Sequence, residues 1–149
     1  MPVLRQVQVL PVSREKLWDF VSTPMNLNRI TPSDMAFEII GEVPEKTFAG
    51  QLIEYRLKIP VLGRTHWVTE ITKVKETISF VDRQLKGPYK SWVHQHFLED
   101  VGEGTKMTDE IHYLLPFGIF GQLAHVLFVK RTLSRIFEYR RQQLGEIFP

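Results

Sequence analysis

The sequence predicts an α+β fold in which a curved antiparallel sheet of seven strands wraps around one long C-terminal helix. Two patterns indicate this fold. Residues 36–115 alternate between apolar and polar side chains in short runs that end at turn residues, whereas residues 117–148 carry apolar side chains at helical spacing. A sheet with one apolar face needs a cover, and the C-terminal helix is the only segment long enough to provide it. A strongly curved sheet closed by one helix readily leaves a pocket between the two.

The N-terminal segment predicts one strand and two short helices. Residues 5–10, RQVQVL, alternate as a first strand. Ser13 is a suitable N-cap for a helix that turns three apolar side chains inward, Leu17, Phe20 and Val21. Pro24 ends this helix, and residues 24–30 form a second short helical stretch.

The central segment predicts six sequential antiparallel strands. They are separated by turn signals, of which the clearest lie at residues 60–63, at Gly87 with Pro88, and at residues 100–104. Hairpin connections of this kind make a meander in which neighbouring strands are also neighbours in the chain. The expected strands cover residues 36–43, 50–59, 64–74, 77–85, 90–99 and 105–115.

Residues 117–148 predict one amphipathic helix with a bend near Gly118 and Gly121. Its apolar stripe is formed by Leu123, Val126, Val129, Leu133, Ile136, Phe137, Leu144 and Ile147. Its basic residues are expected on a solvated face: Lys130, Arg131, Arg135, Arg140 and Arg141. A sharper interpretation of this basic face is transient contact with an anionic membrane surface.

Composition narrows the class of protein. The 149 residues, 43% of them hydrophobic, predict a single domain over 1–149 and a core of ordinary size. The chain has no spanning apolar run and no signal-peptide pattern, so we expect a soluble cytoplasmic protein. Without cysteine, only His, Asp and Glu remain as possible metal ligands, and a net charge of +2 argues against nucleic-acid binding. The motifs of serine hydrolases, P-loop proteins and dinucleotide-binding proteins are missing.

Three neighbouring strands carry polar side chains among apolar ones on faces of the same parity. Trp92, His94, His96 and Leu98 share one face of their strand. Phe80, Asp82 and Gln84 share a face of the preceding strand, and Met107, Asp109, Ile111 and Tyr113 share a face of the following one. If these faces align, Asp82, His94, His96 and Asp109 come within hydrogen-bonding reach. His66 and His112 are expected on the opposite face, and His125 has no evident partner.

The element order resembles the helix-grip fold of the SRPBCC superfamily, which includes START-type lipid-transfer domains, birch-pollen-allergen-like ligand binders and polyketide cyclase/dehydrase-like proteins. The segments FVDRQLKGPYKSWVHQHFLED, GTKMTDEIHYLLPFGIFG and IFEYRR are similar to a group of small bacterial SRPBCC proteins whose ligands are mostly unassigned. That group tends to place an aromatic residue two positions after the second histidine, where this chain has Leu98. The resemblance implies an apolar-ligand cavity on the concave face of the sheet, but it implies no reaction.

We therefore predict binding or transport of a small hydrophobic molecule or lipid between the sheet and the C-terminal helix. The predicted ligand-binding residues are Tyr55, Trp67, Phe80, Gln84, Trp92, His94, His96, Tyr113 and Phe137. The alternative is an enzyme of cyclase/dehydrase type, in which His94 or His96 acts as the base and Asp109 or Asp82 orients it. A third class is a membrane-associated or protein-interaction module without chemistry.

The same four polar residues allow simpler interpretations. They can satisfy one another inside the core, or they can orient a carboxylate, carbonyl or hydroxyl group of the ligand. A same-face His-x-His pair with a carboxylate can also bind a non-haem metal, but this spacing alone is a weak signal. We predict no cofactor and no metal, and the sequence leaves the oligomeric state open.

Overall fold

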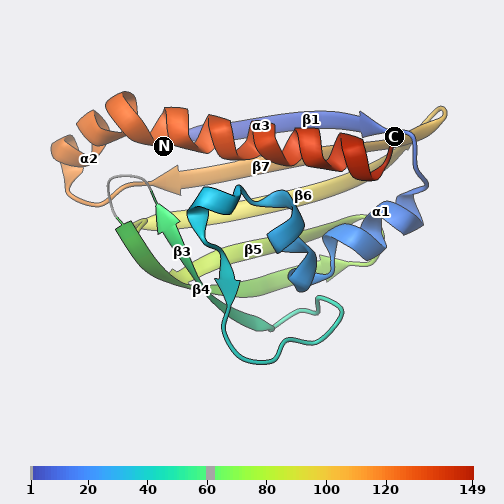
Figure 1. Ribbon diagram of the computed structural model, residues 1–149, viewed down its shortest axis with the longest axis horizontal. Coiled ribbons are helices and arrows are strands. Elements are labelled where there is room, and N and C mark those ends of the chain that lie inside the picture. The colour runs from blue at the N-terminus through green and yellow to red at the C-terminus, as the bar shows by residue number, and fades with distance from the viewer. Residues whose placement is uncertain (1, 60–62) are drawn as a thin grey trace.

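The computed structural model describes residues 2–59 and 63–149. Its centre is one seven-stranded antiparallel sheet in the order β1-β7-β6-β5-β4-β3-β2, over which the C-terminal helix runs lengthwise (Figure 1). This is the architecture that the alternation pattern predicts. The strands are β1 Val3–Leu10, β2 Glu38–Ile39, β3 Leu52–Ile59, β4 Gly63–Lys75, β5 Ser79–Lys86, β6 Ser91–Val101 and β7 Gly104–Leu114.

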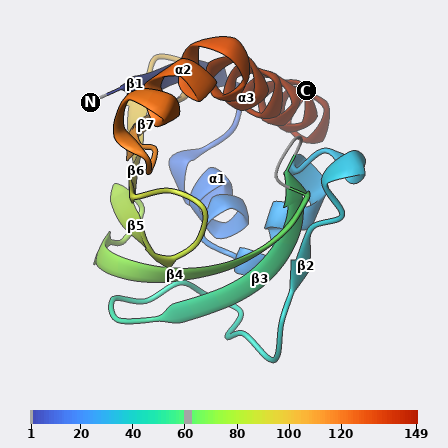
Figure 2. The ribbon, with the colours of Figure 1, turned by 90° about the vertical axis from the view of Figure 1, so that its left-hand side faces the viewer.

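The segment between β1 and β2 holds the predicted short helices. Helix α1, Arg14–Val21, begins where Ser13 accepts a hydrogen bond from the backbone N–H of Lys16 at 3.3 Å, as the capping pattern predicts. Two 3₁₀ helices follow, η1 Pro24–Ile30 and η2 Ser33–Met35. They lie at the open side of the curved sheet (Figure 2). Four of their apolar residues line the interior cavity: Pro24, Leu27, Ile30 and Met35.

The sheet bends into a half-barrel around the interior (Figure 2). Part of the bend comes from β4, whose pairing with β5 shifts register between Val68 and Thr69 and again between Ile71 and Lys73. Such irregularities increase local twist and curvature. Strand β2 is much shorter than the expected strand 36–43, and most of the expected turn 60–63 lies outside the described residues.

The C-terminal helical segment is continuous but not uniform. It consists of α2 Gly118–Ala124, a π-helical turn η3 His125–Val129, and α3 Lys130–Ile147. A side chain at Gly121 would place its Cβ 2.1 Å from the carbonyl oxygen of Pro116, so only glycine allows α2 to fold back this closely. The irregularity that the sequence predicts at Gly118 and Gly121 extends to η3, a kind of helical turn that is frequent at functional sites.

The apolar stripe is buried only in α3. Leu133, Phe137 and Leu144 are buried there, whereas Leu123 and Val126 are 58% and 73% exposed, contrary to the expectation that they face the sheet. The reason is positional, because α2 and η3 extend past the end of the sheet (Figure 1). None of the helices in the described ranges is long and apolar enough to cross a membrane.

The core is divided in two along the sheet. One cluster surrounds α1 and includes Trp18, Phe80 and Leu144, and the other surrounds the middle of β6 and includes Trp92 and Phe137. The polar residues of β5, β6 and β7 lie between these clusters, where the sheet is covered by α3. This gap in the apolar packing is where the candidate site lies.

Candidate functional site

A cavity of about 170 Å³ lies between the concave face of the sheet and α3. Most of its lining is apolar and comes from β3 to β7, α3 and the two 3₁₀ helices. Aromatic side chains form the largest part of the wall: Tyr55, Trp67, Phe80, Tyr89, Trp92 and Phe137.

The aromatic wall is organised around Trp67. Its ring stacks on Tyr55 at a centroid distance of 5.8 Å and meets Trp92 edge to face at 5.2 Å. Tyr89, from the β5–β6 turn, contacts both tryptophans. Aromatic pairs in these geometries stabilise one another beyond the area they bury, so this wall is a firm surface for a ligand.

One pole of the cavity is a network of two histidines and two aspartates. The register pairs Asp82 with His94 and His96 with Asp109, so the parity argument correctly predicts that the four lie together. His94 Nε2 lies 2.8 Å from Asp109 Oδ1, and His96 Nε2 lies 2.6 Å from Asp82 Oδ2. His96 Nδ1 is also 3.2 Å from Asp109 Oδ1. His96 therefore bridges both carboxylates.

The two histidines differ in their tendency to hold a proton. Burial and the neighbouring His96 lower the pKa of His94, whereas contact with both aspartates outweighs burial and raises the pKa of His96. The histidines hold the pKa values of Asp82 and Asp109 below the usual range despite burial. Both ring nitrogens of His96 face carboxylate oxygens, so the network is satisfied when His96 is protonated and His94 is neutral. Since Asp109 is ionised, His94 Nε2 donates to it, and the lone pair of His94 is on Nδ1.

Arg140 of α3 is the fifth Asp, His or Arg side chain in the cavity lining, although it was predicted to lie on the solvated basic face. Its guanidinium lies over the Phe137 ring at 4.8 Å. Burial lowers the pKa of Arg140, but a guanidinium stays protonated at neutral pH. Its Nε atom is buried and lacks a hydrogen-bond partner among the described residues.

The five Asp, His and Arg side chains of the cavity lining balance in charge. Two carboxylates are offset by His96 and Arg140 when His94 is neutral, so the cavity has no net charge at neutral pH. Two of the lining residues each carry a buried hydrogen-bond donor that has no partner within residues 2–59 and 63–149: Arg140 Nε and Trp67 Nε1. Buried donors without a partner are uncommon in proteins. Both atoms can only donate a hydrogen bond, so the partner that each lacks is an acceptor.

Three of the four polar residues also have the composition of a metal site. Asp82, His94 and His96 each offer one ligand atom, and these atoms lie within 4.8 Å of one another. An imidazole–carboxylate set suits several divalent transition metals. Three of the four imidazole nitrogens already contact a carboxylate closely, so a metal ion would have to replace these hydrogen bonds.

The structure places two predicted wall residues outside the cavity. The Gln84 side chain lies at the end of β5 and bonds both backbone groups of Tyr89, donating to its carbonyl oxygen at 2.7 Å. The Gln84 side chain therefore stabilises the β5–β6 turn and does not line the cavity. Tyr113 is buried behind Trp92, and its hydroxyl lies 2.6 Å from His125 Nε2. His125 therefore has a partner, contrary to the sequence analysis.

The remaining predicted wall residues all line the cavity: Tyr55, Trp67, Phe80, Trp92, His94, His96 and Phe137. His66 and His112 bond Glu54 and Glu110 on the outer face, as parity predicts.

Lining residues of two kinds were not predicted from the sequence. Met35 reaches the cavity from η2, Phe37 from the irregular segment after it, and Tyr89 from a turn; no periodic pattern marks such positions. Arg140 did carry a signal. It lies three residues after Phe137 and four before Leu144, which is the spacing of the buried stripe.

Comparison with known proteins identifies the fold. No family model and no curated protein matches the chain. Among solved structures, a protein from Thermus thermophilus superposes with a TM-score of 0.74 at 18% identity, covering 97% of this chain and 95% of that one. The ginseng (Panax ginseng) major latex-like protein 151 superposes with a TM-score of 0.71 at 14% identity, covering 99% and 97%.

A third structure, a nucleoside-diphosphate sugar epimerase from Corynebacterium glutamicum, superposes with a TM-score of 0.68 at 26% identity, but only 28% of that chain is covered. Together the likenesses show the birch-pollen-allergen-like helix-grip fold and are consistent with the superfamily resemblance. Such a fold hosts unrelated functions, so the function must be argued from the cavity.

Proposed function

We propose that this chain is a single SRPBCC-type helix-grip domain that binds a small, largely apolar molecule carrying at least one hydrogen-bond-accepting oxygen. The observation that carries the proposal is a largely aromatic cavity in which two of the lining residues, Trp67 and Arg140, each have a buried donor, Nε1 and Nε, without a partner in the described part of the chain. A ligand oxygen that accepts from either donor removes the cost of leaving it unpaired, which is about 1–3 kcal/mol. A pure hydrocarbon cannot do this.

The size of the cavity favours a compact ligand over a whole lipid. Pockets for drug-sized ligands measure roughly 300–1,000 Å³, whereas an apolar cavity of about 150 Å³ holds benzene. The cavity of about 170 Å³ is therefore suited to a molecule near the size of one substituted ring. Flat aromatic walls on several sides favour a ring as well.

The charge balance favours a ligand without net charge. Binding a carboxylate would leave one excess negative charge in a buried site unless His94 took up a proton, and burial lowers the pKa of His94. A carbonyl or ether oxygen accepts the same hydrogen bonds without this cost. An uncharged cyclic ketone, aryl ketone or aryl ether has the required chemistry.

The proposal is tested with a matched pair of probes. Acetophenone and ethylbenzene have similar shape, but only acetophenone has an acceptor oxygen. Because Trp67 and Trp92 line the cavity, binding of either probe should quench intrinsic fluorescence. Acetophenone should bind at least about tenfold more tightly. Equal affinities, or no quenching by either probe, would argue against the proposal. Native mass spectrometry of the freshly purified protein then identifies any co-purifying molecule.

One observation favours acid–base chemistry as a second candidate. The pKa values of two adjacent cavity residues are displaced in opposite directions, which is the pattern of an acid and a base placed side by side. His94 Nδ1 would take a proton from a carbon next to a carbonyl, with Asp109 orienting the ring and the Arg140 guanidinium polarising the oxygen. Cyclisation and dehydration both begin with such a step.

This candidate makes a prediction of its own for acetophenone. In D₂O the protein should exchange the methyl protons of acetophenone for deuterium faster than buffer does, as followed by proton NMR. His94→Gln should remove the excess exchange while fluorescence still reports binding. Exchange at the rate of buffer alone would leave binding as the function.

A further inference from the structure

The surface of the helical segment before α3 is mostly apolar, with Gln122 as its exposed polar residue. Residues 117–129 contain no charged side chain. Seven large apolar side chains in this stretch, here termed the apolar cap, are each at least half exposed: Phe117, Ile119, Phe120, Leu123, Val126, Leu127 and Phe128. A helix with apolar residues all round is normally buried, and contiguous patches of this kind mark interaction sites.

The cap lies at one end of the molecule, together with the ends of several strands (Figure 1). Phe117, Phe120 and Phe128 form one side of a groove of about 770 Å³ whose other side includes Pro88 of the β5–β6 turn. The groove shares Ile59, Tyr89 and Thr132 with the inner cavity. The cap therefore stands at an opening of the candidate site.

Three chain segments pass through this end, residues 55–69, 83–98 and 111–137. They contain no Asp or Glu, so all their charged residues are basic. Besides Arg56, six of their basic residues have no ion pair within the described ranges: Lys58, Arg64, Lys86, Lys90, Lys130 and Arg131. Since the whole chain carries only +2, the rest of it is net negative.

We propose that this end of the molecule docks on an anionic lipid bilayer, with the apolar cap inserted among the lipids and the six cations on the headgroups. An exposed apolar helix bordered by lysine and arginine is the combination that binds such surfaces. Docking of two copies through the cap would bring the two sets of cations together, so charge disfavours a second copy as the occupant. Docking places the groove, and thus the way into the cavity, against the bilayer.

Vesicle flotation tests the docking with the intact protein. The wild type should float with phosphatidylcholine vesicles that contain about 30 mol% phosphatidylglycerol and should float poorly with phosphatidylcholine alone. Both Ile119→Ser/Phe120→Ser and Lys130→Gln/Arg131→Gln should lower the partition coefficient roughly tenfold or more. Equal binding by the variants and the wild type, or no binding by any of them, would overturn the proposal.

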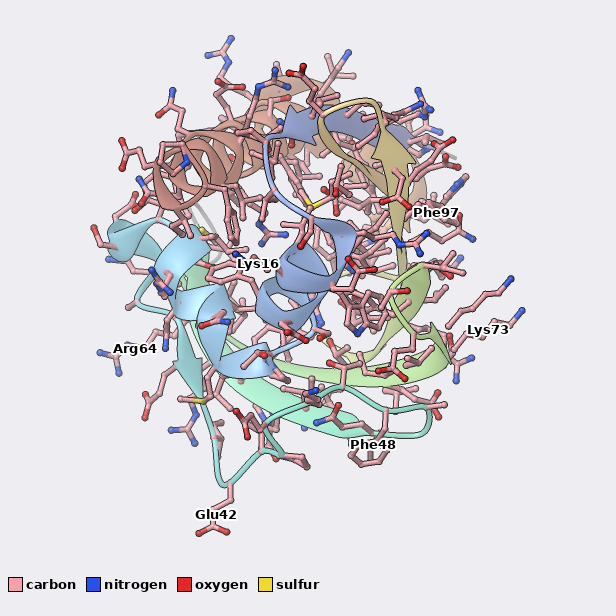
Figure 3. All side chains as sticks on the ribbon, turned by 90° about the vertical axis from the view of Figure 1, so that its right-hand side faces the viewer. Lys16, Glu42, Phe48, Arg64, Lys73 and Phe97 are labelled. Atoms are coloured by element: carbon pink, nitrogen blue, oxygen red, sulfur yellow. The ribbon has the colours of Figure 1, made fainter. Side chains whose placement is uncertain are left out.

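Matched controls come from the opposite end of the molecule, where Phe48 and Lys73 project outward (Figure 3). Phe48→Ser and Lys73→Gln/Lys75→Gln remove the same kinds of side chain and should leave flotation unchanged. Phe120→Trp adds a direct reading of insertion, since its fluorescence should shift to the blue and be quenched by brominated lipids. Concentration-dependent dimerisation of the wild type that the cap variant abolishes would instead assign the cap to a second copy and contradict membrane docking.

Discussion

The imidazole rings of His94 and His96 stack at a centroid distance of 3.6 Å and an angle of 24°. Each ring also contacts a carboxylate of an adjacent strand, and Phe80 covers the other face of His96 at 3.9 Å. Two cationic rings at this distance would repel each other strongly in a buried site. The stack therefore holds one proton more easily than two, and the two histidines titrate as a pair.

The stability of the protein should be highest near pH 6.5, the ordinary pKa of histidine. The raised pKa of His96 stabilises the folded state below that pH, and this contribution is lost as pH rises through the folded-state value. The lowered pKa of His94 reduces the stability of the folded state below pH 6.5, because the unfolded chain then binds a proton at His94 that the folded protein does not bind. Urea unfolding between about pH 5 and pH 9 measures the free energy of unfolding on both sides of this maximum.

Substitution of His96 separates the loss of stability above pH 6.5 from the loss below it. His96→Gln should flatten the loss of stability above pH 6.5, whereas His66→Gln, on the outer face, should leave it in place. An alkaline limb unchanged in His96→Gln would contradict the protonated state assigned to His96.

Asp109→Asn should lower the free energy of unfolding at pH 7 by about 3–5 kcal/mol, because it removes one partner of a buried charge network. Asp109 is only 4% exposed and contacts both histidines. The adjacent Glu110→Gln, on the outer face, should change the free energy by less than about 0.5 kcal/mol. Denaturant titration measures both, and a loss below about 1 kcal/mol for Asp109→Asn would show that the network contributes little.

Arg140→Met should raise the pKa of His94. Methionine keeps most of the apolar stem of Arg140 but removes its positive charge. The two carboxylates are then offset by His96 alone, so His94 binds a proton more readily. The matched variant is Arg141→Met, because the Arg141 side chain donates to the carbonyl oxygen of Val7 outside the cavity. Nitrogen NMR of the imidazole rings follows the titration. A pKa of His94 that stays the same in both variants would contradict the charge balance.

Tyr113→Phe should loosen the start of the helical segment. The hydrogen bond between the Tyr113 hydroxyl and His125 connects β7 to η3. Removal of one such hydrogen bond costs about 1 kcal/mol. Amide hydrogen exchange should accelerate in residues 118–129 and remain unchanged in the strands. Tyr139→Phe, further along α3, serves as the control, and equal exchange in both variants would show that the contact does not restrain η3.

The fold was predictable because it depends on periodicity. Alternation and turn residues were sufficient to predict seven strands in the right order, and Ser13 marked the start of α1. The parity of β5, β6 and β7 predicted the meeting of four polar residues, since side-chain direction in a strand follows from position alone.

The features that the sequence did not predict depend on where helices and strands end and on which other elements they contact. Gln84 has the right parity for the cavity wall but sits at the end of β5, where the turn captures its amide. Leu123 lies at helical spacing but beyond the sheet, so its face has nothing to cover. Arg140 was assigned by charge to the solvated face, although its spacing matched the buried stripe, and the aspartates that make its burial tolerable are distant in the sequence.

In the proposed function, the unpartnered donors of Trp67 and Arg140 donate hydrogen bonds to an oxygen of the ligand. Proton–nitrogen NMR observes both N–H groups directly. During titration with acetophenone, the Trp67 indole or the Arg140 Nε resonance should move downfield as a hydrogen bond forms, and ethylbenzene should not produce this shift. The same displacement with both probes, or shifts confined to surface residues, would contradict the account.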